Sequence, residues 1–212
     1  MKVVIAGGHG QIALHLSRLL SERGDTVLGL IRRAEHTDDL RAVGAEPVLH
    51  DLESSSVADL AAVLTGADAV VFAAGAGPNS GAARKDTVDR AAAVLLADAA
   101  EAAGVRRYVM ISAFRTDAFD PDSDDVFQVY KRAKSEADAD LRARDLDWTI
   151  LRPGALTNDE PTGLVEVAPE VDRASIPRAD VAALVVSALD SPSSVRQQYE
   201  AVSGSTPVAK AF

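Results

Sequence analysis

Tyr130 and Lys134 lie four residues apart in the stretch "VYKRAKSEAD", which spans residues 129–138. On a helix, residues at this spacing share a face, so the two side chains can meet. A free tyrosine has a pKa of about 10, and a neighbouring cation lowers that value by stabilising the tyrosinate. The pair could therefore pass a proton to or from a substrate oxygen.

A second interpretation of the same segment needs no chemistry. One apolar stripe at helical spacing contains Val126, Tyr130, Ala133, Ala137 and Leu141. Tyr130 could then be a core aromatic, and Lys134 a solvated cation near Asp138, four residues further on. The elements that surround the segment have to decide between the two interpretations.

Short β-branched runs alternate with longer amphipathic stretches along the chain. The expected strands cover residues 2–7, 26–31, 46–51, 68–75, 106–112, 146–154, 164–169 and 198–204. The expected helices cover residues 10–23, 37–43, 56–64, 84–103, 125–144 and 177–190. Strands that are apolar at nearly every position are buried on both faces, as in a parallel sheet between two helix layers. The pattern predicts one α/β domain over residues 1–212, a doubly wound parallel sheet of the Rossmann type with a small C-terminal extension.

The turn after the first strand reads "VVIAGGHGQIA" and gives Gly7, Gly10 and Ala13 a G-x-x-G-x-x-A spacing. Glycines let backbone N–H groups approach a pyrophosphate, and the helix N-terminus adds partial positive charge. In the first strand–helix turn of an α/β chain, this motif favours a dinucleotide site over a glycine-rich turn that binds nothing. His9, inside the turn, would flank the phosphates.

The residue types at the end of the second strand indicate which of the two nicotinamide cofactors, NAD(H) or NADP(H), is bound. NAD-selective folds commonly carry Asp or Glu there, whereas this chain has Arg32 and Arg33, which suit a 2′-phosphate. The alternative is a solvated basic pair at a strand end. Asp51, which ends the third strand, could bond the adenine amino group or cap the next turn. We therefore expect NADP(H) in preference to NAD(H). The small residues "AAG" at 73–75 would leave room for the cofactor at the end of the fourth strand.

Composition excludes several classes of partner. The 212 residues carry a formal net charge of −10, which argues against nucleic acid and anionic membranes. No apolar run approaches the roughly 18 residues that a spanning helix needs. Cysteine is absent and the four histidines lack metal-ligand spacing, so we expect no disulfide, no metal and a cytoplasmic protein.

Several motifs together resemble the short-chain dehydrogenase/reductase superfamily, in its atypical branch. The stretches that carry the resemblance are "IAGGHGQIA", "VVFAAG", "VDRAAAVLLADAAEAAGVRRYVMIS", "YKRAKSEAD" and "WTILRPGALT". The likeness is to small NAD(P)-binding members of the NmrA-like and biliverdin/flavin-reductase-like kind, and it covers essentially the whole chain. The motifs are specific for fold and cofactor, and not for substrate.

The resemblance implies a role for each matching position. Residues toward the phosphates and 2′-phosphate would be Gly7, Gly10, Gln11, Ile12, Arg32 and Arg33. Residues toward adenine, ribose and nicotinamide would be Asp51, Leu52, Ala73, Ala74, Gly75, Pro153 and Gly154. Ser112, Tyr130 and Lys134 match the superfamily's catalytic residues and would also contact the cofactor. Tyr130 would exchange the proton, Lys134 would hold the nicotinamide ribose and lower the tyrosine pKa, and Ser112 would orient the substrate oxygen.

The predicted function is an NADP(H)-dependent oxidoreductase that transfers hydride to a small carbonyl, quinone or flavin-like acceptor. One alternative is a non-catalytic NADP(H)-binding redox sensor, as among some NmrA-like relatives. Another is a sugar-nucleotide epimerase-like enzyme, which the short C-terminal region disfavours. We expect segment 155–176 on the substrate side, and a monomer or homodimer whose partner is a small molecule.

Overall fold

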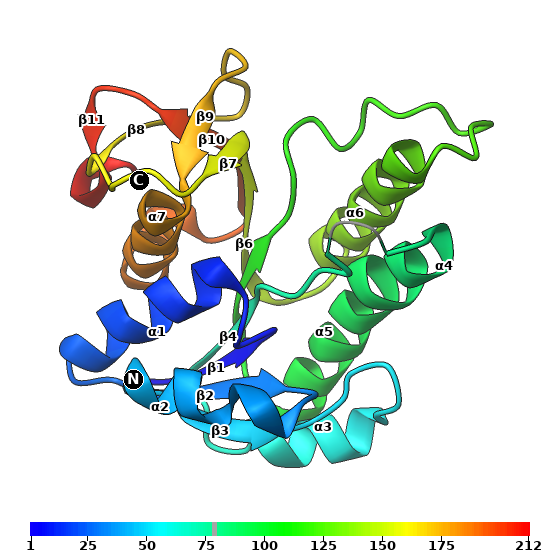
Figure 1. Ribbon diagram of the computed structural model, residues 1–212, viewed down its shortest axis with the longest axis vertical. Coiled ribbons are helices and arrows are strands. Elements are labelled where there is room, and N and C mark those ends of the chain that lie inside the picture. The colour runs from blue at the N-terminus through cyan, green and yellow to red at the C-terminus, as the bar shows by residue number, and fades with distance from the viewer. Residues whose placement is uncertain (78–79) are drawn as a thin grey trace.

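A nine-stranded sheet crosses the molecule in the order β11-β8-β10-β6-β5-β4-β1-β2-β3, with helices on both faces (Figure 1). The computed structural model describes residues 1–77 and 80–212. The strands are β1 (Lys2–Ala6), β2 (Thr26–Ile31), β3 (Glu46–Leu49), β4 (Ala69–Phe72), β5 (Arg107–Ile111), β6 (Asp147–Pro153), β7 (Ala155–Thr157), β8 (Leu164–Ala168), β9 (Ser175–Pro177), β10 (Gln197–Ser203) and β11 (Thr206–Pro207). Neighbours from β3 through β10 are parallel, and β8 and β11 add an antiparallel edge. The predicted α/β fold with its large parallel sheet is confirmed, and it is consistent with a Rossmann fold.

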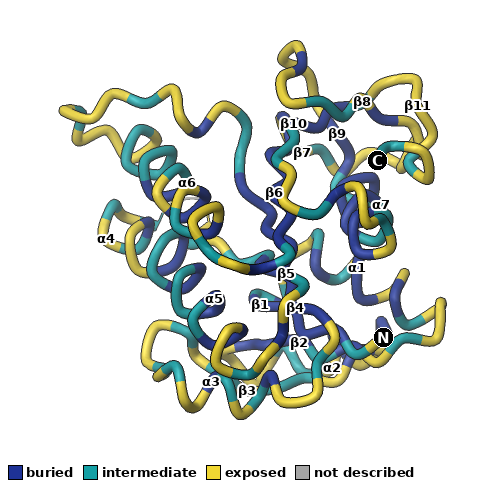
Figure 2. The backbone as a smooth tube through the Cα atoms, turned by 180° about the vertical axis from the view of Figure 1, so that it is seen from behind, coloured by how far each residue is buried: buried dark blue, intermediate teal, exposed yellow. Residues whose placement is uncertain are grey.

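Two helix layers cover this sheet. The helices are α1 (Gln11–Glu22), α2 (Thr37–Ala42), α3 (Val57–Leu64), α4 (Ala82–Arg84), the π-helix η2 (Lys85–Ala91), α5 (Ala92–Ala103), α6 (Val126–Arg142) and α7 (Arg178–Asp190). α1 and α7 pack on one face, and α3, α5 and α6 on the other (Figure 1). Alternate strand residues such as Val3 and Val4 face opposite layers, so the sheet is buried on both sides (Figure 2). Among the described residues, no helix is both long enough and apolar enough to cross a membrane.

The strand order determines where a ligand can bind. β1 lies between β2 and β4, so the chain moves outward from β1 to β2 and β3 and then crosses back to β4. Connections that diverge on the two sides of one strand leave a crevice at the carboxyl ends of the strands. The glycine turn, the start of α1 and residues 73–75 meet at this crevice.

The helix expected over 84–103 differs most from its prediction. Arg84 ends the short helix α4, the next 7 residues form the π-helix η2, and a regular α-helix starts only at Ala92. Lys85 Nζ donates to the Gly77 carbonyl at 2.9 Å, and a carboxylate oxygen of Asp89 accepts the Ala76 N–H at 3.3 Å. These bonds tie the wider turn to the loop that follows β4, and π segments are frequent at functional sites.

Candidate functional site

Two cavities flank the residues that follow β4. The smaller cavity, about 160 Å³, lies over the ends of β2 and β3, and the larger cavity, about 660 Å³, lies between β4, β5, η2 and α6. Ala74 and Gly75 line both cavities, so the two spaces adjoin at the crevice of the sheet. Other predicted residues that line the smaller cavity are Gly7, His9, Arg32, Asp51 and Leu52. Other predicted residues that line the larger cavity are Ile12, Ala73, Ser112, Tyr130 and Lys134.

The glycine turn has no room for side chains at two positions. Gly7 has a φ of +82°, and a Cβ there would lie 2.6 Å from the Ala74 Cα. A Cβ on Gly8 would lie 2.7 Å from the Gly29 Cα. Gly10 is the N-cap residue of α1, and no side chain in the described part of the chain caps the first turn of this helix. The turn is thus pressed against β4 and β2 and leaves helix N–H groups free at the crevice, which fits a pyrophosphate.

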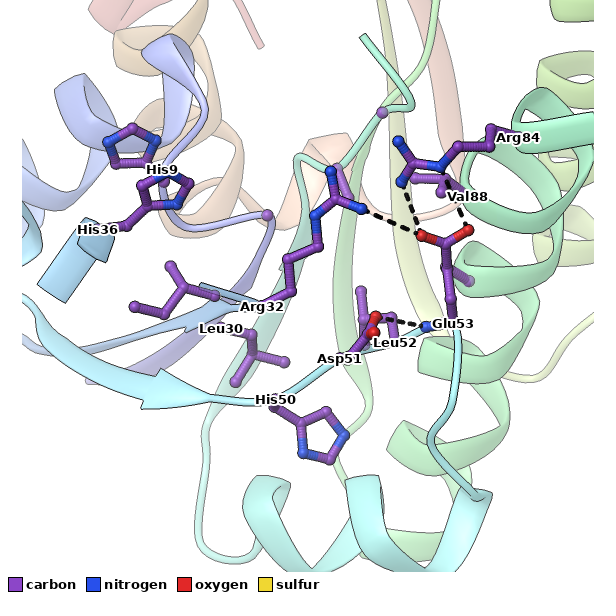
Figure 3. Close-up of a pocket in the computed structure, with 15 residues that line it drawn as sticks. His9, Leu30, Arg32, His36, His50, Asp51, Leu52, Glu53, Arg84 and Val88 are labelled. Carbon is purple, nitrogen blue, oxygen red and sulfur yellow. Dashed lines mark hydrogen bonds and ion pairs between the residues drawn. The ribbon is translucent and has the colours of Figure 1, made fainter. Parts of the chain in front are cut away.

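Apolar side chains form the walls of the smaller cavity, and polar side chains stand at its rim (Figure 3). Leu30, Leu52 and Val88 supply the apolar surface. Asp51 lines the cavity and also accepts the Glu53 N–H at 3.0 Å, so it caps the turn while facing the cavity. A cavity with apolar side chains on its walls and a carboxylate at its edge fits an adenine ring.

The two predicted arginines lie apart. Arg32 lines the smaller cavity, whereas Arg33 does not and pairs with Glu35 at 3.1 Å. Of this basic pair, the structure brings Arg32 to the rim of the cavity and leaves Arg33 beside a surface carboxylate.

His9 is held by the segment after β2. Its Nε2 lies 2.8 Å from Asp39 Oδ2, and its ring stacks on His36 with the centroids 3.6 Å apart. Burial, and then the charge of His9, lower the pKa of His36, so His36 is neutral at pH 7.

The Gln11 side chain lines a separate cavity beside residues 157–161. Within the described residues, no group of three or more His, Asp or Glu side chains could hold a metal ion.

α6 carries Tyr130 and Lys134 to the larger cavity, where Ser112 arrives from the end of β5. The apolar stripe of α6 divides along its length: its buried members are Ala133, Ala137 and Leu141. Its first members, Val126 and Tyr130, line the cavity instead. Tyr130 is therefore only half-buried and is not a core aromatic. The structure brings the three predicted catalytic residues to one cavity.

Lys134 is not the solvated cation of the second interpretation. It is 3% exposed, and its Nζ lies 3.5 Å from Asp89 Oδ1, where Asp89 is 1% exposed. The same ammonium lies 5.2 Å from the centroid of the Phe72 ring. A buried cation needs such a partner, because desolvation without one is costly.

The pKa of Tyr130 moves opposite to the predicted direction. Burial raises this pKa, and the carboxylates of Asp89 and Asp138 raise it further. Since Asp89 pairs with Lys134, the lysine charge that would stabilise a tyrosinate is offset. Tyr130 is therefore a protonated phenol at neutral pH.

A buried carboxylate engages the hydroxyl of Ser112. Ser112 Oγ donates to Asp138 Oδ2 at 2.9 Å, and Arg152 Nε donates to the same oxygen at 2.8 Å. Arg152 also binds Asp117 at 2.6 Å. Among the described residues Asp138 Oδ1 has no partner, and burial raises the pKa of Asp138. Ser112 thus stands at the cavity wall with its proton directed away toward Asp138.

Lys85 and Asp89 are two residues of the larger cavity that were not predicted from the sequence. Lys85 is 8% exposed, lines the larger cavity, and places its Nζ 5.1 Å from the centroid of the Tyr130 ring. Asp89 lines the same cavity and holds Lys134. Their signal in the sequence was a lysine and an aspartate four residues apart on the helix that carries buried Val88.

The predicted C-terminal features lie mostly away from both cavities. Pro153 and Gly154 are buried but line neither one, and a Cβ on Gly154 would lie 2.2 Å from the Ala174 carbonyl oxygen. Glycine there lets β6 pack against the strand pair β7–β9. Segment 155–176 forms β7, β8 and the start of β9, and among its described residues only Leu156 reaches the larger cavity.

Comparison with known proteins gives the family. A family model described as NAD(P)H-binding matches residues 7–192. YhfK of Bacillus subtilis, an uncharacterised sugar epimerase, is 36% identical over 213 residues, covering 100% of this chain and 99% of YhfK. A candidate NAD-dependent epimerase/dehydratase from Bacillus halodurans is 33% identical with a TM-score of 0.90, covering 99% of this chain and 97% of that one. The oxidoreductase ylbE from Lactococcus lactis is 29% identical with a TM-score of 0.86, covering 100% and 94%. The chain therefore belongs to the NAD(P)H-binding family of oxidoreductase- and epimerase-like proteins.

Proposed function

We propose that this chain is an NADP(H)-dependent reductase of a small carbonyl, quinone or flavin-like acceptor. The observation that carries the proposal is the junction of the two cavities, with Ser112, Tyr130 and Lys134 all lining the larger one. A dinucleotide along this junction would have its adenosine in the smaller cavity and its nicotinamide in the larger. A cytoplasmic monomer or homodimer that meets its substrate as a free small molecule belongs to the same proposal.

The residues around the junction fit this cofactor. Free N–H groups of the glycine turn and of α1 would hold the pyrophosphate. Asp51 and Leu52 would hold the adenine, Arg32 the 2′-phosphate, and Lys134 the nicotinamide ribose. When bound, NADPH supplies the hydride that an acceptor takes up.

Tyr130 would act as the proton donor. It is protonated at neutral pH because burial and Asp89 raise its pKa, so it can give its hydroxyl proton to an acceptor oxygen that gains negative charge. The same surroundings disfavour the tyrosinate that would serve as a base.

The larger cavity suits an acceptor with an apolar body and a polar end. Val126, Phe127 and Leu156 line it and are among the exposed large apolar side chains, with Phe127 59% exposed. Covering these side chains with a flat aromatic or quinone ring would remove apolar surface from water. Lys85, on the same cavity, would stabilise an oxygen of the acceptor that becomes negative.

An acceptor panel tests the proposal. The protein is incubated with NADPH and a series of quinones, flavins and aldehydes, and the loss of NADPH absorbance is followed. We expect turnover with at least one member of the panel. NADPH binding without turnover across the panel would instead indicate a redox sensor. A separate incubation supplies a sugar nucleotide with NADP⁺, and its isomerisation without net reduction of the cofactor would indicate an epimerase.

A further inference from the structure

One carboxylate joins two guanidinium groups across the rim of the smaller cavity (Figure 3). Arg84 Nη2 lies 2.7 Å from Glu53 Oε2, and Arg32 Nη1 donates to the same oxygen at 3.4 Å. Thr87 Oγ1 donates to Glu53 Oε1 at 2.7 Å. Arg32 follows β2, Glu53 follows β3, and Arg84 ends α4, so the three charges come from three separate segments.

This cluster, Arg32–Glu53–Arg84, carries a net positive charge in a chain whose formal net charge is −10. Hydrogen bonds from Arg84 and Thr87 lower the pKa of Glu53, so the carboxylate is ionised at neutral pH. Two guanidinium groups therefore converge on the Glu53 carboxylate, while Asp51 and Asp89 act on Arg84 through their charges without a hydrogen bond to it. A phosphate monoester, with nearly two charges and three acceptor oxygens, would match two such donors better than a carboxylate does.

We propose that Glu53 occupies the position of a phosphate between Arg32 and Arg84, and that the 2′-phosphate of NADP(H) takes its place. Arg84 is then a second ligand of the 2′-phosphate, and it reaches the phosphate from the wall of the smaller cavity opposite Arg32. Glu53 is a specificity determinant that competes with this phosphate for both arginines. The inference rests on the NADP(H) preference proposed above and assigns the residues that set it.

The two partners of one ion pair should change cofactor selectivity in opposite directions. Arg84→Gln removes a phosphate ligand, so the preference for a 2′-phosphate should fall about tenfold. Glu53→Gln removes the competitor, so the same preference should rise about threefold. A merely structural salt bridge would be lost equally in both variants and would move selectivity the same way in each.

Calorimetric titration with 2′,5′-ADP and with 5′-AMP measures this preference without nicotinamide or acceptor. The quantity compared is the ratio of the two Kd values in wild type, Arg84→Gln, Glu53→Gln and Arg84→Lys. Arg84→Lys keeps the positive charge but loses the paired N–H donors of the guanidinium. Its ratio of Kd values should therefore lie between those of wild type and Arg84→Gln. Matched controls come from the neighbouring surface pair Arg90–Asp86, joined at 2.6 Å, as Arg90→Gln and Asp86→Asn.

Opposite shifts in Glu53→Gln and Arg84→Gln, with both controls unchanged, would support the inference. Shifts of the same sign, no shift, or equal shifts in the controls would overturn it. The wild-type ratio is a separate test: a Kd for 2′,5′-ADP above that for 5′-AMP would contradict the proposed cofactor preference, while the signs of the two shifts would still decide the roles of Glu53 and Arg84.

Discussion

Each of the two cavities has an ion pair at its wall, and the pair at the smaller cavity is much more exposed than the pair at the larger one. At the smaller cavity Glu53 meets Arg84 at 2.7 Å, and the side chains are 27% and 35% exposed. At the larger cavity Asp89 and Lys134 are almost wholly buried and lie 3.5 Å apart. Exposed pairs contribute little to stability and exchange partners readily, whereas a buried pair is costly to break. The smaller cavity is thus suited to exchanging one anion for another, and the larger to holding a fixed arrangement of charge.

Asp89→Asn should have the largest effect, because it leaves the Lys134 ammonium buried without a counter-charge. The free energy of unfolding, measured by urea denaturation, should fall by about 3 kcal/mol. Glu53→Gln should lower it by less than about 1 kcal/mol. Adding Lys134→Met to Asp89→Asn should restore part of the loss. Equal losses in Asp89→Asn and Glu53→Gln would remove the distinction between the cavities.

Tyr130→Phe separates chemistry in the larger cavity from binding in the smaller. With a confirmed acceptor, kcat should fall about a hundredfold because the proton donor is gone. The Kd for NADPH should stay within about twofold of wild type. Arg84→Gln should give the reverse, with weaker NADPH binding and unchanged kcat at saturation. A Tyr130→Phe variant that turns over normally would remove Tyr130 from the mechanism.

Ser112→Ala should have a smaller effect than Tyr130→Phe, because the Ser112 proton already bonds Asp138. We expect kcat to fall about tenfold or less. Thr116→Val is the matched control, since the Thr116 hydroxyl also donates to Asp138, at 3.4 Å, but does not line the larger cavity. Equal losses of kcat in the two variants would assign Ser112 to the support of Asp138 alone.

The smallest expected effect is on stability in acid. The folded-state pKa of Glu53 lies below its ordinary value of 4.5, so its ion pairs stabilise the protein above that pH, and this contribution disappears as the pH falls through the lowered value. Urea denaturation should therefore find wild type more stable than Glu53→Gln at pH 7, by less than about 1 kcal/mol, and equally stable in strong acid. A difference that grows toward low pH would contradict this assignment.

Most of the fold follows from periodicity in the sequence. The apolar runs at residues 2–7 and 106–112 contain the strands β1 and β5, which are buried on both faces, and Gly104 follows α5 in a left-handed conformation. The π-helix η2 could not be predicted, since its irregular turn depends on hydrogen bonds between the side chains of Lys85 and Asp89 and the backbone of the loop that follows β4. The strands β7, β9 and β11, of two or three residues each, carry too little pattern to be recognised.

Those parts of the candidate site whose residues come from a single segment of the chain could be predicted from the sequence. The glycine turn and the spacing of Tyr130 and Lys134 are local, and both lead to the crevice of the sheet. The predicted direction of the Tyr130 pKa was wrong because this pKa depends first on burial in the folded chain and then on Asp89, which another helix supplies. Arg84 and Glu53 went unnoticed for the same reason, since their meeting requires the folded chain.

A crystal structure with NADP⁺ bound would test most directly whether one dinucleotide occupies both cavities. We expect adenine against Leu52, the 2′-phosphate between Arg32 and Arg84 with Glu53 turned aside, and the nicotinamide ring beside Tyr130. A nicotinamide outside the larger cavity would contradict the proposed reductase site. A 2′-phosphate exposed to solvent, with Glu53 still bound to both arginines, would contradict the exchange of anions.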